Sequence, residues 1–176
     1  GMKPNSDIAP WHYDMTQLGF NYRITDIQCA LGLSQLKKLD EFCETRQKIA
    51  KKYDTAFKDT IVKPLYTFDG NSSYHLYVVQ IDFSKLNITK VELFNVLREK
   101  NIGIQLHYIP INKQPYYKNR YGPLILPGVS TYYSRCLSLP LWPGMNLNDV
   151  DHVIKALVEI LGISFDHETR IASRDK

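Results

Sequence analysis

Two polar side chains, Asn21 and Arg23, stand immediately before the longest helical pattern in the sequence. Thr25 followed by Gln28 forms a capping-box pattern, in which each side chain accepts a hydrogen bond from a backbone N–H of the other residue. This pattern predicts a helix that begins at Asp26, whose carboxylate suits the positive end of the helix dipole. An amide and a guanidinium held before such a helix are placed to contact a ligand, although turn residues of this kind also serve purely structural roles.

A second group of candidate side chains lies in the segment HYIPINKQPYY, residues 107–117. His107 is expected to close a strand, and Tyr108 and Tyr116 follow it in a loop that two prolines hold stiff. Binding sites are commonly built at strand ends and in the loops after them. The segment is therefore a candidate ligand-facing surface, and plain packing of its aromatic rings is the alternative.

A complete catalytic set is missing from the sequence. The histidines show no metal-ligand spacing, and there is no glycine-rich phosphate loop. Ser34 and Lys37 match a nucleophile motif only over four residues inside a helical pattern. The sequence thus predicts no metal site and no catalytic residue in this chain.

The composition is that of an ordinary globular protein, with 44% hydrophobic and 23% charged residues among 176. The net charge of +4 comes from scattered basic residues, which does not favour nucleic acid but is compatible with a small anionic ligand. No apolar run reaches transmembrane length and no signal peptide precedes the chain, so no membrane partner is expected. Three cysteines without metal spacing indicate buried thiols in a reducing, cytoplasmic compartment. The opening Gly1-Met2 suggests a cut into a longer protein.

The elements that must position these side chains follow from periodicity and turn signals. A single helix is expected from Asp26 to about Asp59, long enough that it either bends around Gly32 or bridges two bodies. Six further elements are expected: strand 74–83, a helix capped by Thr89 and Glu92, strand 104–108, a short helix 129–135, strand 138–141, and a last helix from Asn146 or Asn148 to about Leu161. This order favours an α+β fold, in which helices cover one face of a small antiparallel or mixed sheet.

Four stretches of the chain resemble the second half of the DegT/DnrJ/EryC1/StrS family, sugar aminotransferases that use pyridoxal phosphate. They are QLGFNYRITDIQCALGLSQLKKLDEF, SSYHLYVVQID, HYIPINKQPYY and LSLPLWPGMNLNDVDHVIKAL, and together they cover about residues 9–161 in the family's order. The HYIP–QPYY stretch resembles in particular the branch that aminates UDP-4-keto-6-deoxy-N-acetyl-hexosamines on the route to pseudaminic acid. Many relatives carry a histidine where this chain has Asn112, so neither a sugar contact nor a proton transfer is assigned to that position.

The resemblance implies a fold type I enzyme, a homodimer with active sites at the subunit interface. Its pyridoxal-phosphate lysine belongs to a large N-terminal domain upstream of the matched stretches, and no lysine of this chain occupies that motif. The chain would then comprise an arm of the large-domain side (1–24), a connecting helix (25–59), the small C-terminal domain (60–163) and a polar tail (164–176).

The same resemblance implies roles for five residues. Asn21 would reach the phosphate of pyridoxal phosphate in the partner subunit, which fits an amide donor before a helix start. Arg23 would assist with an anionic group nearby, and His107, Tyr108 and Tyr116 would line the pocket of a nucleotide-linked sugar.

The expected activity of the full enzyme is amination of a UDP-linked 4-keto-6-deoxy sugar with glutamate as amino donor. The isolated chain is expected to be inactive because the missing N-terminal domain carries the lysine. Two alternatives stay open at this stage. One is a free-standing binding or dimerisation module, and the other is a dehydratase of the same family in which histidine replaces the lysine.

Overall fold

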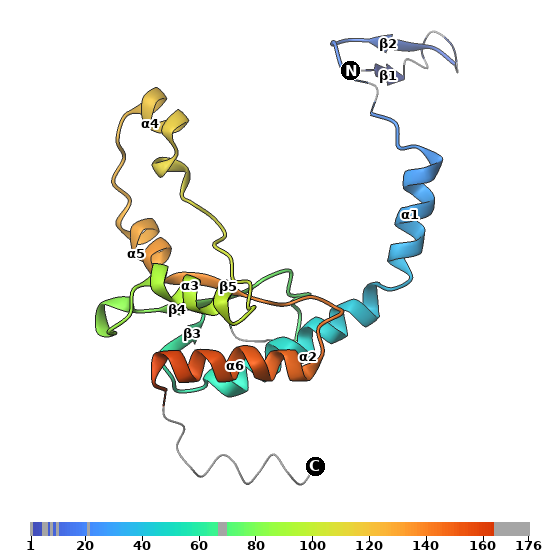
Figure 1. Ribbon diagram of the computed structural model, residues 1–176. Coiled ribbons are helices and arrows are strands. Elements are labelled where there is room, and N and C mark those ends of the chain that lie inside the picture. Colours follow the sequence, from blue (N-terminus) through green and yellow to red (C-terminus); the bar gives the residue numbers. More distant parts are fainter. Residues whose placement is uncertain are drawn as a thin grey trace. The chain divides into compact units, whose positions relative to one another are not determined.

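The computed structural model describes residues 2–4, 7, 9, 11–20, 22–66 and 70–163, and Figure 1 shows the course of the chain. The chain divides into two compact units, residues 1–39 and 40–176. None of the helices in the described part is long and apolar enough to cross a membrane.

The first unit contains a small hairpin and one helix. Strand β1 (Met2–Pro4) pairs antiparallel with β2 (Tyr13–Met15), in a region where the sequence suggested only an extended arm. Helix α1 (Asp26–Leu36) begins where the capping box predicted, because Thr25 accepts a hydrogen bond from the backbone of Gln28 and the Gln28 side chain accepts one from the backbone of Thr25.

Helix α1 has no buried residue along its length. Ile27 and Leu31 are both exposed, although they lie four positions apart and so share one face of the helix. Exposed apolar side chains that share one helix face form the kind of surface that can pack against another domain or protein.

The prediction of one uninterrupted helix from Asp26 to about Asp59 is wrong, because the structure has two helices in this range. Helical structure breaks at Lys37 and Lys38, where the chain makes a turn, and resumes as α2 (Leu39–Phe57). The amide of Lys38 bonds the carbonyl of Gln35, a tighter i to i−3 contact that ends the first helix. The interruption therefore does not lie at Gly32.

The second unit is built on a three-stranded antiparallel sheet in the order β3-β4-β5. The strands are β3 (Val62–Pro64), β4 (Tyr77–Ile81) and β5 (Cys136–Leu139). Along β4 the residues alternate between buried and partly exposed, as expected for a strand with one face on the core. All four residues of β5 are buried, so both faces of the sheet are covered along this strand.

Three helices supply most of the remaining core, namely α2, α3 (Lys90–Glu99) and α6 (Leu147–Leu161). The predicted caps of the last two are confirmed. Thr89 and Glu92 form a capping box on α3, and Asn146 with Asp149 forms one on α6. Inside the core, the Tyr77 hydroxyl donates to Asp54 at 2.6 Å.

The remaining elements are one short helix between β4 and α3 and three helices between α3 and β5. They are η1 (Phe83–Lys85), η2 (Ile111–Lys113), α4 (Pro115–Tyr121) and α5 (Pro127–Arg135). The predicted strand 104–108 is reduced to a single bridge between Gln105 and Ser138. The chain then leaves β5 towards Pro110, which has no N–H to extend a ladder. The α+β class with a small sheet is confirmed, and the sheet is antiparallel.

Candidate functional site

The segment from His107 to Tyr121 leaves the sheet beside the strand β5 and carries most of the candidate side chains. Two backbone hydrogen bonds join Gln105 and Ser138, with N···O distances of 3.2 and 2.7 Å, and fix the start of the segment. In Figure 1 the segment runs out from the sheet to α4 and returns through α5. It therefore begins beside β5, next to the bridge between Gln105 and Ser138, and the rest of its length runs outward.

His107 is held by Ser138. Its Nδ1 lies 2.8 Å from the Ser138 hydroxyl oxygen, and Ser138 is only 4% exposed. The imidazole stands perpendicular to the ring of Tyr108 with the ring centroids 4.7 Å apart. Since Nδ1 is engaged, Nε2 is the ring nitrogen that remains for a ligand.

Tyr108 and Tyr116 are both strongly exposed, at 72% and 63%. Tyr116 lies in α4, one turn before Arg120, whose guanidinium donates to the Tyr116 hydroxyl at 3.0 Å. The Tyr116 ring also packs edge-on against Tyr117, with the centroids 5.2 Å apart. These contacts fix the Tyr116 side chain within its own helix. The structure thus brings His107 and Tyr108 into contact, whereas Tyr116 is positioned separately by α4.

A cluster of two lysines and a tyrosine ties this segment to the body of the unit. Lys113 of η2 and Lys90 of α3 both place Nζ over the Tyr133 ring, 4.5 and 5.2 Å from its centroid. Lys90 Nζ also donates to the Tyr133 carbonyl at 2.6 Å. Burial lowers the pKa of Lys90, as expected for an ammonium removed from water. Cation–π contacts of this kind hold η2 against α5 and α3.

Asn112 has an internal role. Its side-chain amide donates to the carbonyl of Leu124 at 2.9 Å. This bond links the segment before α4 to the segment after it. The amide nitrogen that a ligand would use is therefore engaged within the chain.

Of the two candidate residues in the first unit, the structure describes only Arg23. Arg23 is exposed in the stretch of residues 22–25 that precedes α1. Asn21, the predicted contact of pyridoxal phosphate, lies outside the described residues.

Lys90 is not placed as the lysine of a pyridoxal-phosphate site would be. Such a site needs a lysine amine open to a carbonyl compound. Lys90, whose burial lowers its pKa, instead has its ammonium on the Tyr133 carbonyl and ring. Within the described part, no three His, Cys, Asp or Glu side chains gather as a metal site would require.

Sequence patterns missed three residues that build the site. Ser138 gave no signal because its partner His107 lies 31 residues away. Arg120 and Tyr116 have the spacing of helical neighbours, and Pro115 in the first turn of α4 was the available clue. Tyr133, which anchors the loop, had no distinguishing pattern.

Comparison with known proteins gives this geometry its context. Residues 1–158 match the DegT/DnrJ/EryC1/StrS aminotransferase family. The chain belongs to this family.

Two curated relatives are each 40% identical to the chain. One is the Bacillus subtilis spore coat polysaccharide biosynthesis protein SpsC, matched over 89% of this chain and 41% of the relative. The other is the Campylobacter jejuni UDP-4-amino-4,6-dideoxy-N-acetyl-beta-L-altrosamine transaminase, matched over 86% of this chain and 40% of the relative. Among solved structures, Helicobacter pylori PseC, an aminotransferase of pseudaminic acid biosynthesis, aligns with a TM-score of 0.77 at 29% identity. That alignment covers 92% of this chain and 43% of PseC. The chain therefore spans about two fifths of the length of the relatives it matches.

Proposed function

We propose that this chain is the C-terminal part of a pyridoxal-phosphate-dependent aminotransferase that aminates a UDP-linked 4-keto-6-deoxy sugar with glutamate. Membership of the family supports the reaction class, and the match to an altrosamine transaminase supports the sugar class. Pyridoxal phosphate would supply the amino-transfer chemistry from a site that the missing N-terminal domain provides. Such an enzyme would work in the cytoplasm as a homodimer.

The observation that carries the role of this chain is the hydrogen bond between Ser138 and His107. It fixes an imidazole at the start of an exposed aromatic segment and leaves Nε2 as the ring nitrogen for a ligand. A ring held in one orientation loses little further freedom when it binds a sugar hydroxyl or a phosphate oxygen. We assign His107 to the nucleotide-sugar pocket on this basis.

We also assign Tyr108 and Tyr116 to the nucleotide-sugar pocket, because their aromatic rings offer apolar surface. Both rings are exposed, and tyrosine offers an apolar face for a uracil base together with a hydroxyl for the sugar. Arg120 keeps the Tyr116 hydroxyl in place and remains positively charged near it, which suits a nucleotide diphosphate.

The first unit would belong to the large-domain side of the full enzyme. The exposed apolar face of α1 supports this placement, because an N-terminal domain would cover it. In the same proposal Asn21 donates to the cofactor phosphate of the partner subunit, and Arg23 faces an anionic group nearby. Residues 60–163 form the small domain, and the two helices α1 and α2 connect the domains.

The DNA upstream of Met2 and a transamination assay together test the proposal. We expect an open reading frame that encodes a large domain with the cofactor lysine. The whole protein should aminate UDP-4-keto-6-deoxy-N-acetylhexosamine with glutamate, while the isolated chain should not. A histidine in place of the lysine would indicate a dehydratase. A native start at Met2, or transamination by the isolated chain, would contradict the proposal.

A further inference from the structure

A cavity of about 650 Å³ opens beside the sheet, where β4 ends and the last turn of α6 passes. This volume lies within the range of about 300–1,000 Å³ typical of small-molecule sites. Its walls include Lys63 of β3 and Arg135 at the end of α5, and none of the proposed sugar-binding residues lines it. The cavity is thus separate from the site assigned above.

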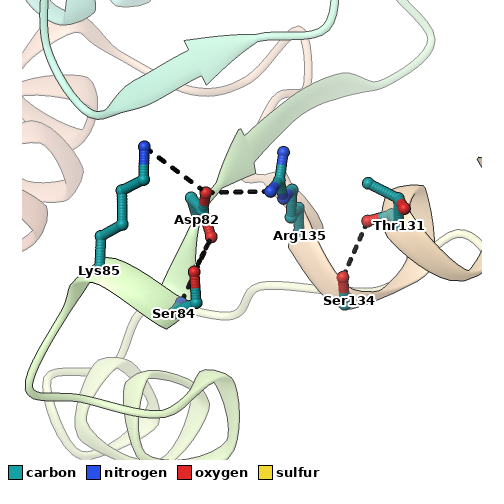
Figure 2. A network of polar contacts seen from close by, with 6 residues as sticks. All are labelled: Asp82, Ser84, Lys85, Thr131, Ser134 and Arg135. Atoms are coloured by element: carbon teal, nitrogen blue, oxygen red, sulfur yellow. Dashed lines mark hydrogen bonds and ion pairs between the residues drawn. The ribbon is translucent and has the colours of Figure 1, made fainter.

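Asp82 lines the cavity and lies at the centre of a network of polar contacts with Ser84, Lys85 and Arg135, which Figure 2 shows. One carboxylate oxygen accepts from the Ser84 hydroxyl at 2.6 Å and from the Ser84 amide at 3.3 Å. The other oxygen accepts from an Arg135 guanidinium nitrogen at 2.9 Å and lies 4.0 Å from Lys85 Nζ. The Ser84 hydroxyl, and to a lesser extent the Arg135 charge, lower the pKa of Asp82, so the carboxylate is ionised at neutral pH.

This arrangement leaves hydrogen-bond donors in excess at the cavity wall. Both carboxylate oxygens of Asp82 accept hydrogen bonds from neighbouring side chains. Arg135 donates to Asp82 through one nitrogen and has further N–H groups that can donate to a ligand. Lys63, Lys85 and Arg135 together carry one more charge than the two lining carboxylates, Asp59 and Asp82. Because its guanidinium is already fixed by Asp82, Arg135 can bind an oxyanion with little loss of side-chain freedom.

Another part of the cavity lining is apolar. Leu86 from the segment after η1, with Leu161 and Ile163 at the end of α6, contributes apolar surface. A ligand that satisfies both kinds of wall carries an anionic head and an apolar body.

We propose that this cavity binds a small organic oxyanion, a carboxylate or phosphate on an apolar body, through Arg135 and Lys63. Arg135 takes two oxygens of the anion in its guanidinium fork, and Lys63 contributes a second positive charge from the neighbouring strand. The ligand would occupy this cavity independently of the nucleotide sugar.

Titration of the isotope-labelled chain with phenyl phosphate and with benzoate, followed by amide chemical shifts, tests the proposal. We expect saturable shifts at Gln80, Leu86 and Gly162, with a dissociation constant on the order of 1 mM for at least one probe. The stronger probe identifies the preferred head group, and benzyl alcohol serves as the neutral control that should not bind.

Three variants sharpen this test. Lys63→Gln and Arg135→Gln should each weaken binding about tenfold. Lys155→Gln removes an exposed positive charge from α6 outside the cavity and should leave the affinity unchanged. Lys63 is exposed on an edge strand, so its variant should keep the fold and spectrum of the parent. Equal binding of benzyl alcohol, shifts confined to other residues, no saturable binding, or an unaltered affinity of Lys63→Gln would overturn the proposal.

Discussion

The imidazole Nδ1 of His107 and the hydroxyl oxygen of Ser138 lie 2.8 Å apart, although 31 positions separate the two residues in the chain. Ser138 is buried in the central part of β5, and backbone bonds to Gln105 hold its strand in register with the segment that ends at His107. Ser138 thus acts as a positioning residue, because it orients the ring through which the ligand would be bound.

Removal of the Ser138 hydroxyl should weaken sugar binding in the whole enzyme without affecting the glutamate half-reaction. Ser138→Ala frees the His107 ring to rotate, so we expect the KM for the nucleotide sugar to rise about fivefold, the equivalent of about 1 kcal/mol. Ser138→Thr keeps a hydroxyl and should restore most of the loss. Equal effects on the glutamate and sugar half-reactions would instead indicate a general structural defect.

The hydrogen bond between Tyr77 and Asp54 should contribute measurably to stability. Tyr77 is buried, and burial followed by the bond to Asp54 raises the pKa of its hydroxyl well above the usual value. Tyr77→Phe leaves the Asp54 carboxylate without this donor, so the free energy of unfolding should fall by about 1–3 kcal/mol in urea titrations. Tyr121→Phe, at an exposed position, is the matched control and should change it by less than about 0.5 kcal/mol.

The Asp82 network should make stability depend on pH in the acid range. The pKa of Asp82 is lowered in the folded chain from 3.8, so its ionised form is stabilising above about that pH. This contribution is lost as the pH falls through the lowered value. The stability difference between the parent and Asp82→Asn should therefore be present at neutral pH and shrink in acid.

The cause of the lowered pKa can be tested separately by carboxyl-carbon NMR. Ser84→Ala removes the hydroxyl that contributes most, and the pKa of Asp82 should rise. Ser134→Ala removes a nearby hydroxyl that bonds only its own helix in Figure 2, and the pKa of Asp82 should stay unchanged. An unaltered pKa in Ser84→Ala would contradict this account of the network.

The isolated chain should self-associate through α1. Ile27 and Leu31 are exposed on one face, and such a surface tends to bind a second copy when its natural cover is absent. The double substitution Ile27→Lys with Leu31→Lys should shift sedimentation towards monomer. Ser34→Lys adds charge to α1 without removing an apolar side chain and should have little effect. Sedimentation of the unaltered chain as a clean monomer would refute this prediction.

Local signals in the sequence predicted much of the fold. The capping residues Thr25, Thr89 and Asn146 each begin a helix, because a cap is a contact between residues three apart and is visible in the sequence. The strand β4 and the helix α6 likewise follow from periodicity in the sequence.

Three features of the fold and of the site were not predicted from the sequence. The long helix breaks at Lys37 and Lys38, although neither residue is a glycine or a proline. The sequence predicts that Pro115 stiffens a loop, whereas it is the first residue of α4, where its missing N–H removes no helical hydrogen bond. The bond between His107 and Ser138 depends on strand register, which sequence spacing does not show.

Kinetics of His107→Ala in the whole enzyme, resolved into the two half-reactions, tests the central claim most directly. If His107 binds the nucleotide sugar, the KM for that substrate should rise at least about tenfold, while the half-reaction with glutamate should proceed at the parent rate. An unchanged KM for the sugar, or an equal loss in the glutamate half-reaction, would contradict the assignment of this segment to the sugar pocket.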